Sequence, residues 1–274
     1  MAIVIPRNRA YWKRKPPSPV ELGGMYSPDD FTNAYIFNSI GTIPLHRDDV
    51  VAESAGISYD DEGVHVDGVA GTEILLDAPI DVTSQEGTIV ARIKKGFTVA
   101  NQINEGVFSD KQVDNWSTTG VSINIHRNGY LLLNIDSAST SDNTSSVFGD
   151  LDYHDIVCFY SASQQARIFV DGVEVSYTSQ PTFPATLATS SHDAKVGAYY
   201  SDSGNFRSKA SVSYLYSFNR RMDVSEALSI SEAPYRILKP RRQYWTIPVE
   251  AGGGPTFQPA WAMASRRSNT IGAM

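Results

Sequence analysis

The chain has 274 residues, of which 41% are hydrophobic and 19% are charged, so it can bury a core and is not globally disordered. Its 20 glycines and 14 prolines follow no three-residue repeat, which excludes a collagen, and no apolar stretch reaches the roughly 18 residues of a membrane-spanning helix. The start lacks the pattern of a secretory signal, and the single cysteine, Cys158, cannot form an internal disulfide. We therefore expect a protein that is made in the cytoplasm and has no membrane partner.

Charge is segregated along the chain. The formal net charge is −7, yet residues 1–17 carry +5 and residues 236–274 carry +5, which leaves −17 for the residues between them. An acidic body with two basic ends suits docking onto an acidic partner surface. Folding of the basic ends back onto the acidic body is the alternative.

Apolar and polar residues alternate with period two through the middle of the chain, and the helical period is nearly absent. Turn-forming residues separate the alternating runs at the spacing of stacked antiparallel sheets. We therefore predict an all-β fold, an antiparallel β-sandwich. In chain order the predicted strands are residues 63–69, 73–76, 88–94, 121–127, 130–135, 155–161, 166–170, 173–177, 194–200 and 210–218.

Two β-hairpins carry the strongest turn signals. Asn128-Gly129 and Asp171-Gly172 each stand between two predicted strands. Both dipeptides tolerate positive φ at the two central positions of a two-residue loop. Each therefore predicts such a loop, and with it the register of its hairpin.

One short helix is predicted near the end of the sandwich. Asp223 is expected to cap its first turn, Glu226 stands three residues on as in a capping box, and Pro234 prevents continuation. The apolar stripe of this helix consists of Ala227, Leu228 and Ile230.

The composition divides the chain into a basic N-terminal arm (1–24), a sandwich (25–235) and a basic, Trp-containing C-terminal arm (236–274). Residues 6–12 and 240–245 each contain a proline, two arginines and a Tyr-Trp pair, a similarity for which chance is the alternative explanation. A large indole outside the sandwich has no core of its own, so it packs on the body or on a partner. The predicted partner-binding residues are Arg7, Arg9, Tyr11, Trp12, Arg241, Arg242, Tyr244, Trp245 and Trp261.

In the second half, one strand ends in Asp171-Gly172, a strand with Val196-Gly197 follows, and residues 212–221 lead into the predicted helix. These residues resemble the closing half of a laminin-G-like, concanavalin-A-like jelly roll. Residues 231–242 and 5–12 are similar to the tail and the opening of proteins of tailed bacteriophages that contain this domain. The resemblance implies a jelly-roll sandwich in a virion structural protein.

The sequence lacks the motifs of familiar enzymes. Neither the closely spaced carboxylates of a retaining glycosidase nor a nucleophile elbow, a zinc-binding helix motif or a phosphate-binding loop is present. The acidic clusters at residues 60–62 and 152–155 are interpreted as solvated turns, and Cys158 as a buried small apolar residue. We therefore predict that the protein is not an enzyme, and a polysaccharide-degrading glycoside hydrolase is the least favoured alternative.

No cofactor is expected, and a calcium ion is the less favoured alternative. Calcium-binding relatives within the laminin-G-like family often carry an acidic pair just before the strand that corresponds to residues 212–221. Here that stretch reads Val212-Ser213-Tyr214 and supplies no carboxylate, whereas calcium prefers six to eight oxygen ligands with carboxylates among them. The five histidines contain no pair at metal-ligand spacing.

Two loops carry aromatic residues beside polar ones, as sugar-binding sites do. Trp116 lies in a polar loop, and Tyr199 and Tyr200 end the predicted strand at 194–200, from which the chain leads to Asp202 in the next loop. We predict these four residues as candidates for glycan binding. The alternative is that the rings close the ends of the sandwich.

These features favour a non-enzymatic virion structural protein. The leading hypothesis is a capsid decoration or cement protein, a homo-oligomer whose arms bind the major capsid protein or other virion proteins. The alternative is a tail or head fibre adhesin that binds host-surface carbohydrate. We expect the virion, assembled in the host cytoplasm, as its location. Nucleic acid is not the expected partner, because about five charges per arm beside an acidic body give weak, salt-sensitive binding.

Overall fold

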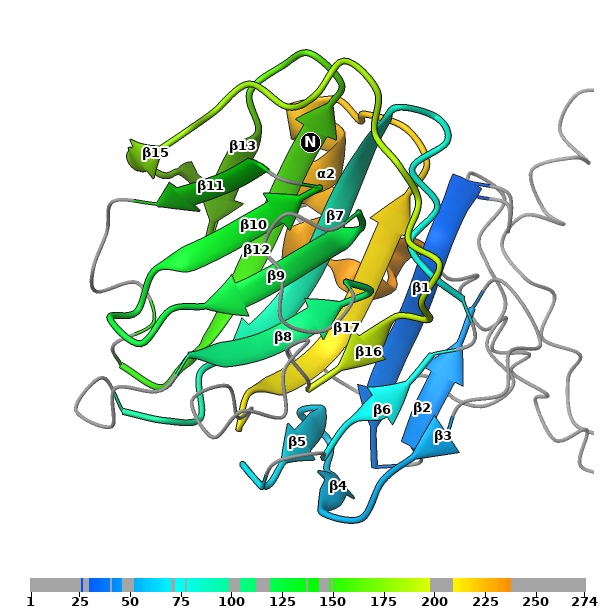
Figure 1. Cartoon of the computed structure of the whole chain (residues 1–274). Helices are drawn as coiled ribbons and strands as arrows, with labels where there is room; N and C mark the ends of the chain where they lie inside the picture. Colours follow the sequence, from blue (N-terminus) through cyan, green and yellow to red (C-terminus); the bar gives the residue numbers. More distant parts are fainter. Residues whose placement is uncertain are drawn as a thin grey trace, which may run out of the picture. The chain divides into compact units, whose positions relative to one another are not determined.

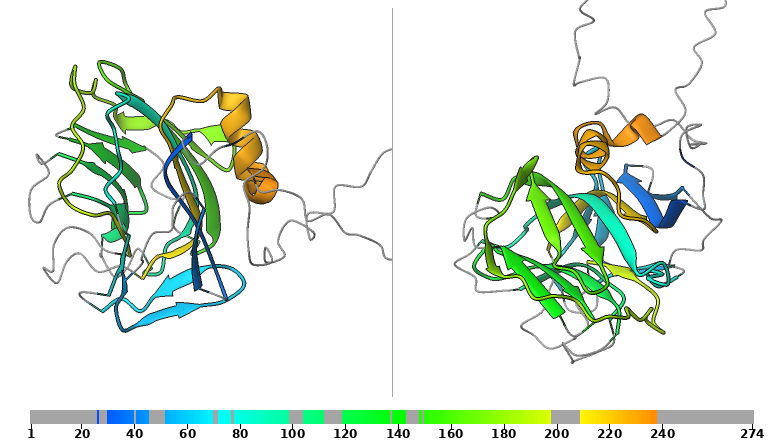
Figure 2. Two further views of the ribbon diagram at one scale, coloured as in Figure 1. Left: turned by 90° about the vertical axis from the view of Figure 1, so that its right-hand side faces the viewer. Right: turned by 90° about the horizontal axis from the view of Figure 1, so that it is seen from above.

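Two antiparallel sheets pack face to face, and a short helix covers the outer face of one of them (Figure 1 and Figure 2). The predicted all-β antiparallel sandwich with one short helix is confirmed. All described residues belong to one structural unit, which ends at Pro240. This computed structural model describes residues 26, 30–39, 41–45, 52–69, 72–76, 78–98, 104–111, 119–136, 138–142, 148, 150–197 and 209–237.

Within the described residues, one sheet has nine strands. They are β1 (Phe31–Asn38), β2 (Gly41–Pro44), β4 (Ile57–Tyr59), β5 (Val64–Val66), β7 (Glu86–Lys94), β12 (Tyr153–Ser161), β13 (Arg167–Val170), β14 (Val173–Glu174) and β17 (Ser211–Phe218). Their order across the sheet is β14-β13-β12-β7-β17-β1-β2. The first residues of β17 pair with β5, which pairs in turn with β4.

The other sheet has eight strands within the same residues. They are β3 (Ala52–Glu53), β6 (Ile74–Leu75), β8 (Glu105–Ser109), β9 (Val121–Ile125), β10 (Leu131–Ile135), β11 (Ala138–Asp142), β15 (Tyr177–Ser179) and β16 (Lys195–Val196). Their order is β15-β11-β10-β9-β8-β16-β6-β3. Figure 1 shows this sheet in front of the nine-stranded one.

The nine-stranded sheet is buried on both faces. Strand β7 sends Ile89, Ala91 and Ile93 into the core between the sheets and Val90 into a second core, which lies under helix α2 (Val224–Glu232) and the 3-10 turn η3 (Pro234–Ile237). Figure 2 shows α2 on the face turned away from the eight-stranded sheet. Strand β1 is buried at all eight of its positions, so it lacks the alternation that predicts a strand, and sequence analysis missed it.

The β9–β10 hairpin is confirmed, but its predicted two-residue loop is wrong. Ile125 pairs with Leu131, so the loop contains residues 127–129, and Gly129 donates its N–H to the carbonyl of His126 at 2.7 Å and has a φ of +87°. This loop is a type I turn followed by a left-handed glycine. It sets the apolar residues of the two strands opposite one another, whereas a two-residue loop would set Ile123 opposite Asn134 and Ile135 opposite Ser122.

The second hairpin has the predicted two-residue loop. Val170 pairs with Val173, and Asp171 and Gly172 both have positive φ, +50° and +84°. The predicted strand over 173–177 is wrong, because β14 stops at Glu174 and the chain crosses to the eight-stranded sheet, where β15 pairs with β11. Apolar and polar residues continue to alternate between β14 and β15. The alternation alone therefore does not show that the chain leaves one sheet for the other.

The predicted helix is confirmed, but its capping box is not formed. Asp223 occupies the N-cap position and makes no side-chain cap hydrogen bond. Glu226 instead accepts two hydrogen bonds from the guanidinium of Arg220, at 2.7 and 3.0 Å. A bidentate, charge-assisted pair is stronger than a hydrogen bond to a backbone N–H, and it joins the helix to the end of β17.

Candidate functional site

All the residues predicted to bind a partner or a glycan lie outside the described residues. The partner-binding set is Arg7, Arg9, Tyr11, Trp12, Arg241, Arg242, Tyr244, Trp245 and Trp261. The glycan-binding set is Trp116, Tyr199, Tyr200 and Asp202. Both sets therefore stay predictions.

The described residues that flank the two predicted glycan-binding segments lie at opposite ends of the eight-stranded sheet. Lys111 follows the end of β8, close to the start of β9. Gly197 lies near the other end of β8, since its N–H donates to the carbonyl of Val107, and Lys209 donates its N–H to Glu105 at 3.2 Å. Trp116 and Tyr199 thus belong to segments that join the sheet at its two ends, a relationship that sequence analysis did not predict.

A polar patch lies on the outer face of the nine-stranded sheet, next to the apolar core that α2 covers. Its first row runs across β12, β7, β17 and β5, because Tyr153 pairs with Lys94, Lys94 with Ser211, and Ser211 with His65. Its second row runs from Asp155 through Arg92 to Tyr214. We call these residues the polar end: His65, Arg92, Lys94, Tyr153, Asp155, Ser211 and Tyr214.

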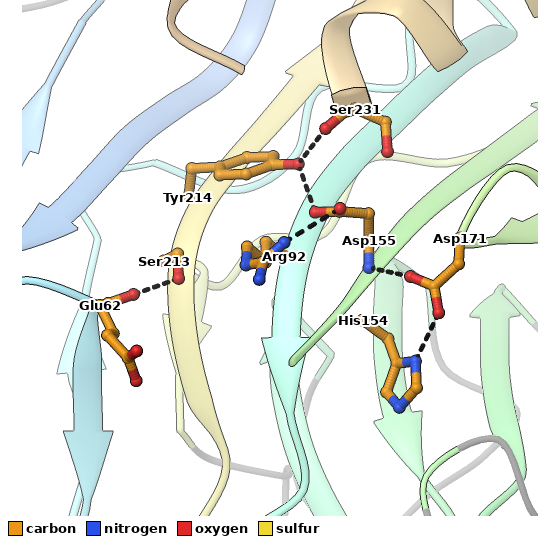
Figure 3. Close-up of polar contacts among 8 residues, drawn as sticks. All are labelled: Glu62, Arg92, His154, Asp155, Asp171, Ser213, Tyr214 and Ser231. Carbon is orange, nitrogen blue, oxygen red and sulfur yellow. Dashed lines mark hydrogen bonds and ion pairs between the residues drawn. The ribbon is translucent and has the colours of Figure 1, made fainter. Parts of the chain in front are cut away.

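Asp155 joins three elements at the polar end (Figure 3). Its carboxylate accepts hydrogen bonds from Arg92 Nη1 and from the Tyr214 hydroxyl, both at 3.0 Å, and the same hydroxyl lies 3.4 Å from the carbonyl oxygen of Ser231 in α2. Burial raises the pKa of Asp155, although Arg92 and Tyr214 oppose the rise. The interpretation of residues 152–155 as a solvated turn is wrong for Asp155, which lies on β12 and is half-buried.

His154 lies on the opposite face of β12 from Asp155. Its Nδ1 is 2.7 Å from Asp171 and its Nε2 is 3.1 Å from Asp150. Asp171 also accepts the N–H of Asp155 at 2.9 Å, so the turn of the β13–β14 hairpin is tied to β12 (Figure 3). Burial lowers the pKa of His154, but the hydrogen bonds to Asp171 and Asp150 outweigh it and raise the pKa above its ordinary value.

Asp60, His65 and Ser211 form a hydrogen-bonded chain of the kind that activates a serine nucleophile. His65 Nδ1 lies 2.7 Å from Ser211 Oγ, and His65 Nε2 lies 2.8 Å from Asp60. In such a triad the carboxylate is buried and the hydroxyl is accessible. Here Asp60 is exposed in a solvated turn, as predicted, while Ser211 is 5% exposed. We assign the chain of contacts a structural role, since it ties β5 to β17.

Tyr153 is the part of the polar end best placed to meet a ligand. Its ring is half-buried, with the Arg92 guanidinium 5.4 Å and the Lys94 ammonium 5.5 Å from the ring centroid. Its hydroxyl lies beside Ser211 and Ser213, and burial raises the pKa of Tyr153 to about 12. Sequence analysis missed this site, although Arg92 and Lys94 stand at charged, outward positions of a predicted strand.

A second polar cluster closes one end of the eight-stranded sheet. The Lys111 ammonium donates to the carbonyl oxygen of Asp136, and burial lowers the pKa of Lys111 while the carboxylates of Asp136 and Asp110 oppose the fall. Asp110 accepts the N–H groups of Ile80 and Val121, and burial raises its pKa. The cluster is buried and holds three loops together.

Within the described residues, no group of three or more His, Cys, Asp and Glu side chains is arranged to hold a metal ion. No helix in the same part of the chain has both the length and the apolar character needed to span a bilayer. Cys158 is buried, as predicted, and burial raises the pKa of its thiol to about 12. The absence of a cofactor stays a prediction.

The fold is similar to that of solved binding domains. The binding domain of botulinum neurotoxin serotype D superposes with a TM-score of 0.57 and 10% identity, over 76% of this chain and 52% of that one. A structure described as the receptor binding domain of botulinum neurotoxin D gives a TM-score of 0.57 at 9% identity, over 76% and 53%. No protein-family model and no curated protein matches the chain.

The prediction that the protein is not an enzyme is wrong. It relied on the absence of known motifs, but the fold is shared with part of an enzyme chain. Trypanosoma rangeli sialidase in complex with sialic acid superposes with a TM-score of 0.57 and 13% identity, over 75% of this chain and 33% of that one. The chain thus spans about half of the neurotoxin domain and about a third of the sialidase. At these identities the likeness shows the fold: a β-sandwich that also occurs in receptor-binding domains and in a sialidase chain.

Proposed function

We propose that this chain is a binding module that recognises a carbohydrate receptor through the polar end. The observation that carries the proposal is the half-buried ring of Tyr153, with Arg92 and Lys94 within 5.5 Å of its centroid. Carbohydrate sites combine an aromatic face with a few fixed polar groups around it. Asp155 holds the guanidinium of Arg92 in place, and the buried hydroxyl of Tyr153 beside Ser211 and Ser213 fixes the ring.

The fold supports the same proposal. Structures of similar fold include a receptor binding domain and a sialidase in complex with sialic acid. The polar end lies on the outer face of the nine-stranded sheet, beyond the part that α2 covers, so a receptor can reach Tyr153 without displacing the helix.

We further propose that the module belongs to a phage virion and that the terminal arms attach it there. The support is the +5 charge of residues 1–17 and of residues 236–274, together with the Tyr-Trp pair in each arm. The leading form is a capsid decoration protein seated on the major capsid protein, and the adhesin of a tail or head fibre is the other. Deletion of both arms is expected to abolish incorporation into particles and to leave glycan binding unchanged. Incorporation of the isolated sandwich at the wild-type level would refute arm attachment.

The experiment for the polar end uses the full chain on an array of bacterial surface glycans. Tyr153→Ala is expected to weaken binding at least tenfold, because it removes the ring. Tyr153→Phe is the matched control and is expected to bind within about twofold of wild type, since the hydroxyl is buried and only the ring meets the ligand. Equal binding by wild type and a folded Tyr153→Ala chain would refute the site, and no binding to any glycan would refute the function.

A further inference from the structure

Lys94 is a cation in the first row of the polar end that no carboxylate balances. It lies between Tyr153 on β12 and Ser211 on β17. Its side chain is half-buried, and within the described residues its ammonium has no ion-pair partner, only the ring of Tyr153 with a centroid 5.5 Å away. The N–H donors of the ammonium are therefore available to an acceptor on a ligand.

The other cation beside the Tyr153 ring, Arg92, is already neutralised. Its Nη1 lies 3.0 Å from the carboxylate of Asp155, which also accepts the hydroxyl hydrogen of Tyr214. A ligand anion at Arg92 would lie close to that carboxylate, and like charges at short range repel. Lys94 is therefore the better position for a negatively charged group of a ligand.

The remaining carboxylates near the polar end lie beyond β17. Asp60 and Glu62 belong to the turn between β4 and β5, and β17 separates β5 from Lys94 on β7. Neighbouring strands are about 4.8 Å apart, so the backbones of β5 and β7 are about 10 Å apart, close to one Debye length at about 0.1 M salt. Figure 3 shows Glu62 and Arg92 on opposite sides of β17. Neither carboxylate therefore cancels the charge of Lys94.

The same two carboxylates give the polar end a direction. Burial raises the pKa of Tyr153 to about 12, and the charges of Asp60 and Glu62 add to the rise. The hydroxyl end of the ring, beside Ser211 on β17, is therefore its negative side. A ligand that stacks on the ring is expected to keep its own anion away from that end, over β7, where Lys94 stands.

We propose that the ligand of the polar end is an anionic saccharide, a glycan that carries a carboxylate or a phosphate, and that Lys94 binds the anion. The proposal rests on the proposed function, because it requires that the polar end binds carbohydrate. It adds the chemical class of the ligand and a residue that determines specificity. Since Lys94 is partly exposed, its ion pair with the ligand is expected to contribute about fivefold in affinity, the upper end for such a pair.

The test uses the full chain on a glycan array in which each acidic glycan, such as polygalacturonic acid, stands beside its uncharged product. Uronic acid glycans are paired with their carboxyl-reduced forms, and phosphorylated glycans with their dephosphorylated forms. Wild type is expected to prefer the anionic member of one kind of pair by about fivefold at low salt, and the pair that it distinguishes identifies the anion. Added salt is expected to reduce the preference.

Lys94→Met removes the charge and keeps an unbranched side chain, and it is expected to lose the preference. Lys94→Arg restores a cation and is expected to keep it. Lys195→Met is the matched control, since it removes one positive charge from the eight-stranded sheet and is expected to leave the preference unchanged. Thermal unfolding checks that each variant is folded. If Lys94→Met is not, Lys94→Gln takes its place, and the salt dependence of the wild-type preference decides if neither folds.

The outcomes separate this proposal from the proposed function. Binding that depends on Tyr153 but is equal for both members of every pair would overturn the anionic ligand and leave the carbohydrate site intact. A preference that persists in a folded Lys94→Met chain would overturn the role of Lys94, and attraction of acidic glycans by the basic arms predicts that result. Absence of binding to any glycan, charged or uncharged, refutes the proposed function itself.

Discussion

The hydroxyl of Tyr214 donates to the carboxylate of Asp155 at 3.0 Å, across the strand that separates β17 from β12. Tyr214 is fully buried, and Arg92 on the intervening strand completes the pairing of the carboxylate. This contact holds three strands in register at the boundary between the apolar core under α2 and the polar end. It therefore positions Arg92 beside Tyr153.

Tyr214→Phe is expected to lower the free energy of unfolding by about 1–3 kcal/mol, because the half-buried carboxylate of Asp155 loses one of its hydrogen-bond donors while the packing of the ring is kept. Urea unfolding at pH 7 measures the change. Tyr130→Phe, at a half-buried ring near a hairpin loop, is the control and is expected to change stability by less than about 0.5 kcal/mol. Equal effects of the two substitutions would contradict the role given to the Tyr214 hydroxyl.

His154 predicts a pH-dependent stability. The folded state raises its pKa, so the contribution of His154 is fully present below the unfolded pKa of about 6.5 and is lost as pH rises through the folded pKa. His154→Gln is therefore expected to destabilise the protein more at about pH 5.5 than at about pH 8.5, measured as the difference in unfolding free energy from wild type.

His126 supplies the control of opposite sign. Burial, with Arg127 and Lys95 nearby, lowers its pKa, so the unfolded state binds the proton more readily. The difference in unfolding free energy between wild type and His126→Gln is then expected to increase with pH. If both histidine variants showed the same pH trend, the contacts with Asp171 and Asp150 would not be what raises the pKa of His154.

Lys111 is expected to be essential for the end of the eight-stranded sheet. Lys111→Met removes the buried cation and leaves Asp110 and Asp136 without their compensating charge, which costs about 3 kcal/mol. Lys195→Met is the matched control, since Lys195 is 40% exposed and pairs with Glu73 at 2.8 Å on the surface, and it is expected to cost less than about 1 kcal/mol. Urea unfolding distinguishes the two, and similar losses would contradict the buried cluster.

Both Gly63 and Gly172 have positive φ, but only Gly63 also lies against a neighbouring strand. A Cβ at Gly63 would overlap the carbonyl oxygen of Val212 in β17, so Gly63→Ala is expected to cost more than about 3 kcal/mol. A Cβ at Gly172 would meet nothing, and its positive φ alone is expected to cost about 1 kcal/mol. Thermal unfolding ranks the two variants, and an equal loss would contradict the close approach of the β4–β5 turn to β17.

Sequence patterns predicted β7, β9, β10, β12, β13 and β17, and the turn residues of both hairpins. They missed β1, which is buried at every position, and the short strands β2, β4, β8 and β11. They also failed where pairing depends on the partner strand, as at Gly129. The polar end was missed because its residues are far apart in sequence, and only the register of four strands makes Tyr153, Lys94, Ser211 and His65 neighbours. Such juxtapositions follow from tertiary pairing, which a single sequence does not encode locally.

Strand β1 pairs with β17, and Phe31 faces Phe218, so the first strand of the sandwich has the last one as its neighbour. During synthesis β1 leaves the ribosome long before β17 exists, and until then its apolar residues lack both this partner and the helix that covers them. Closure of the nine-stranded sheet is therefore a late step in folding, with high contact order and slow kinetics. A chaperone that binds the nascent chain has its longest opportunity at β1.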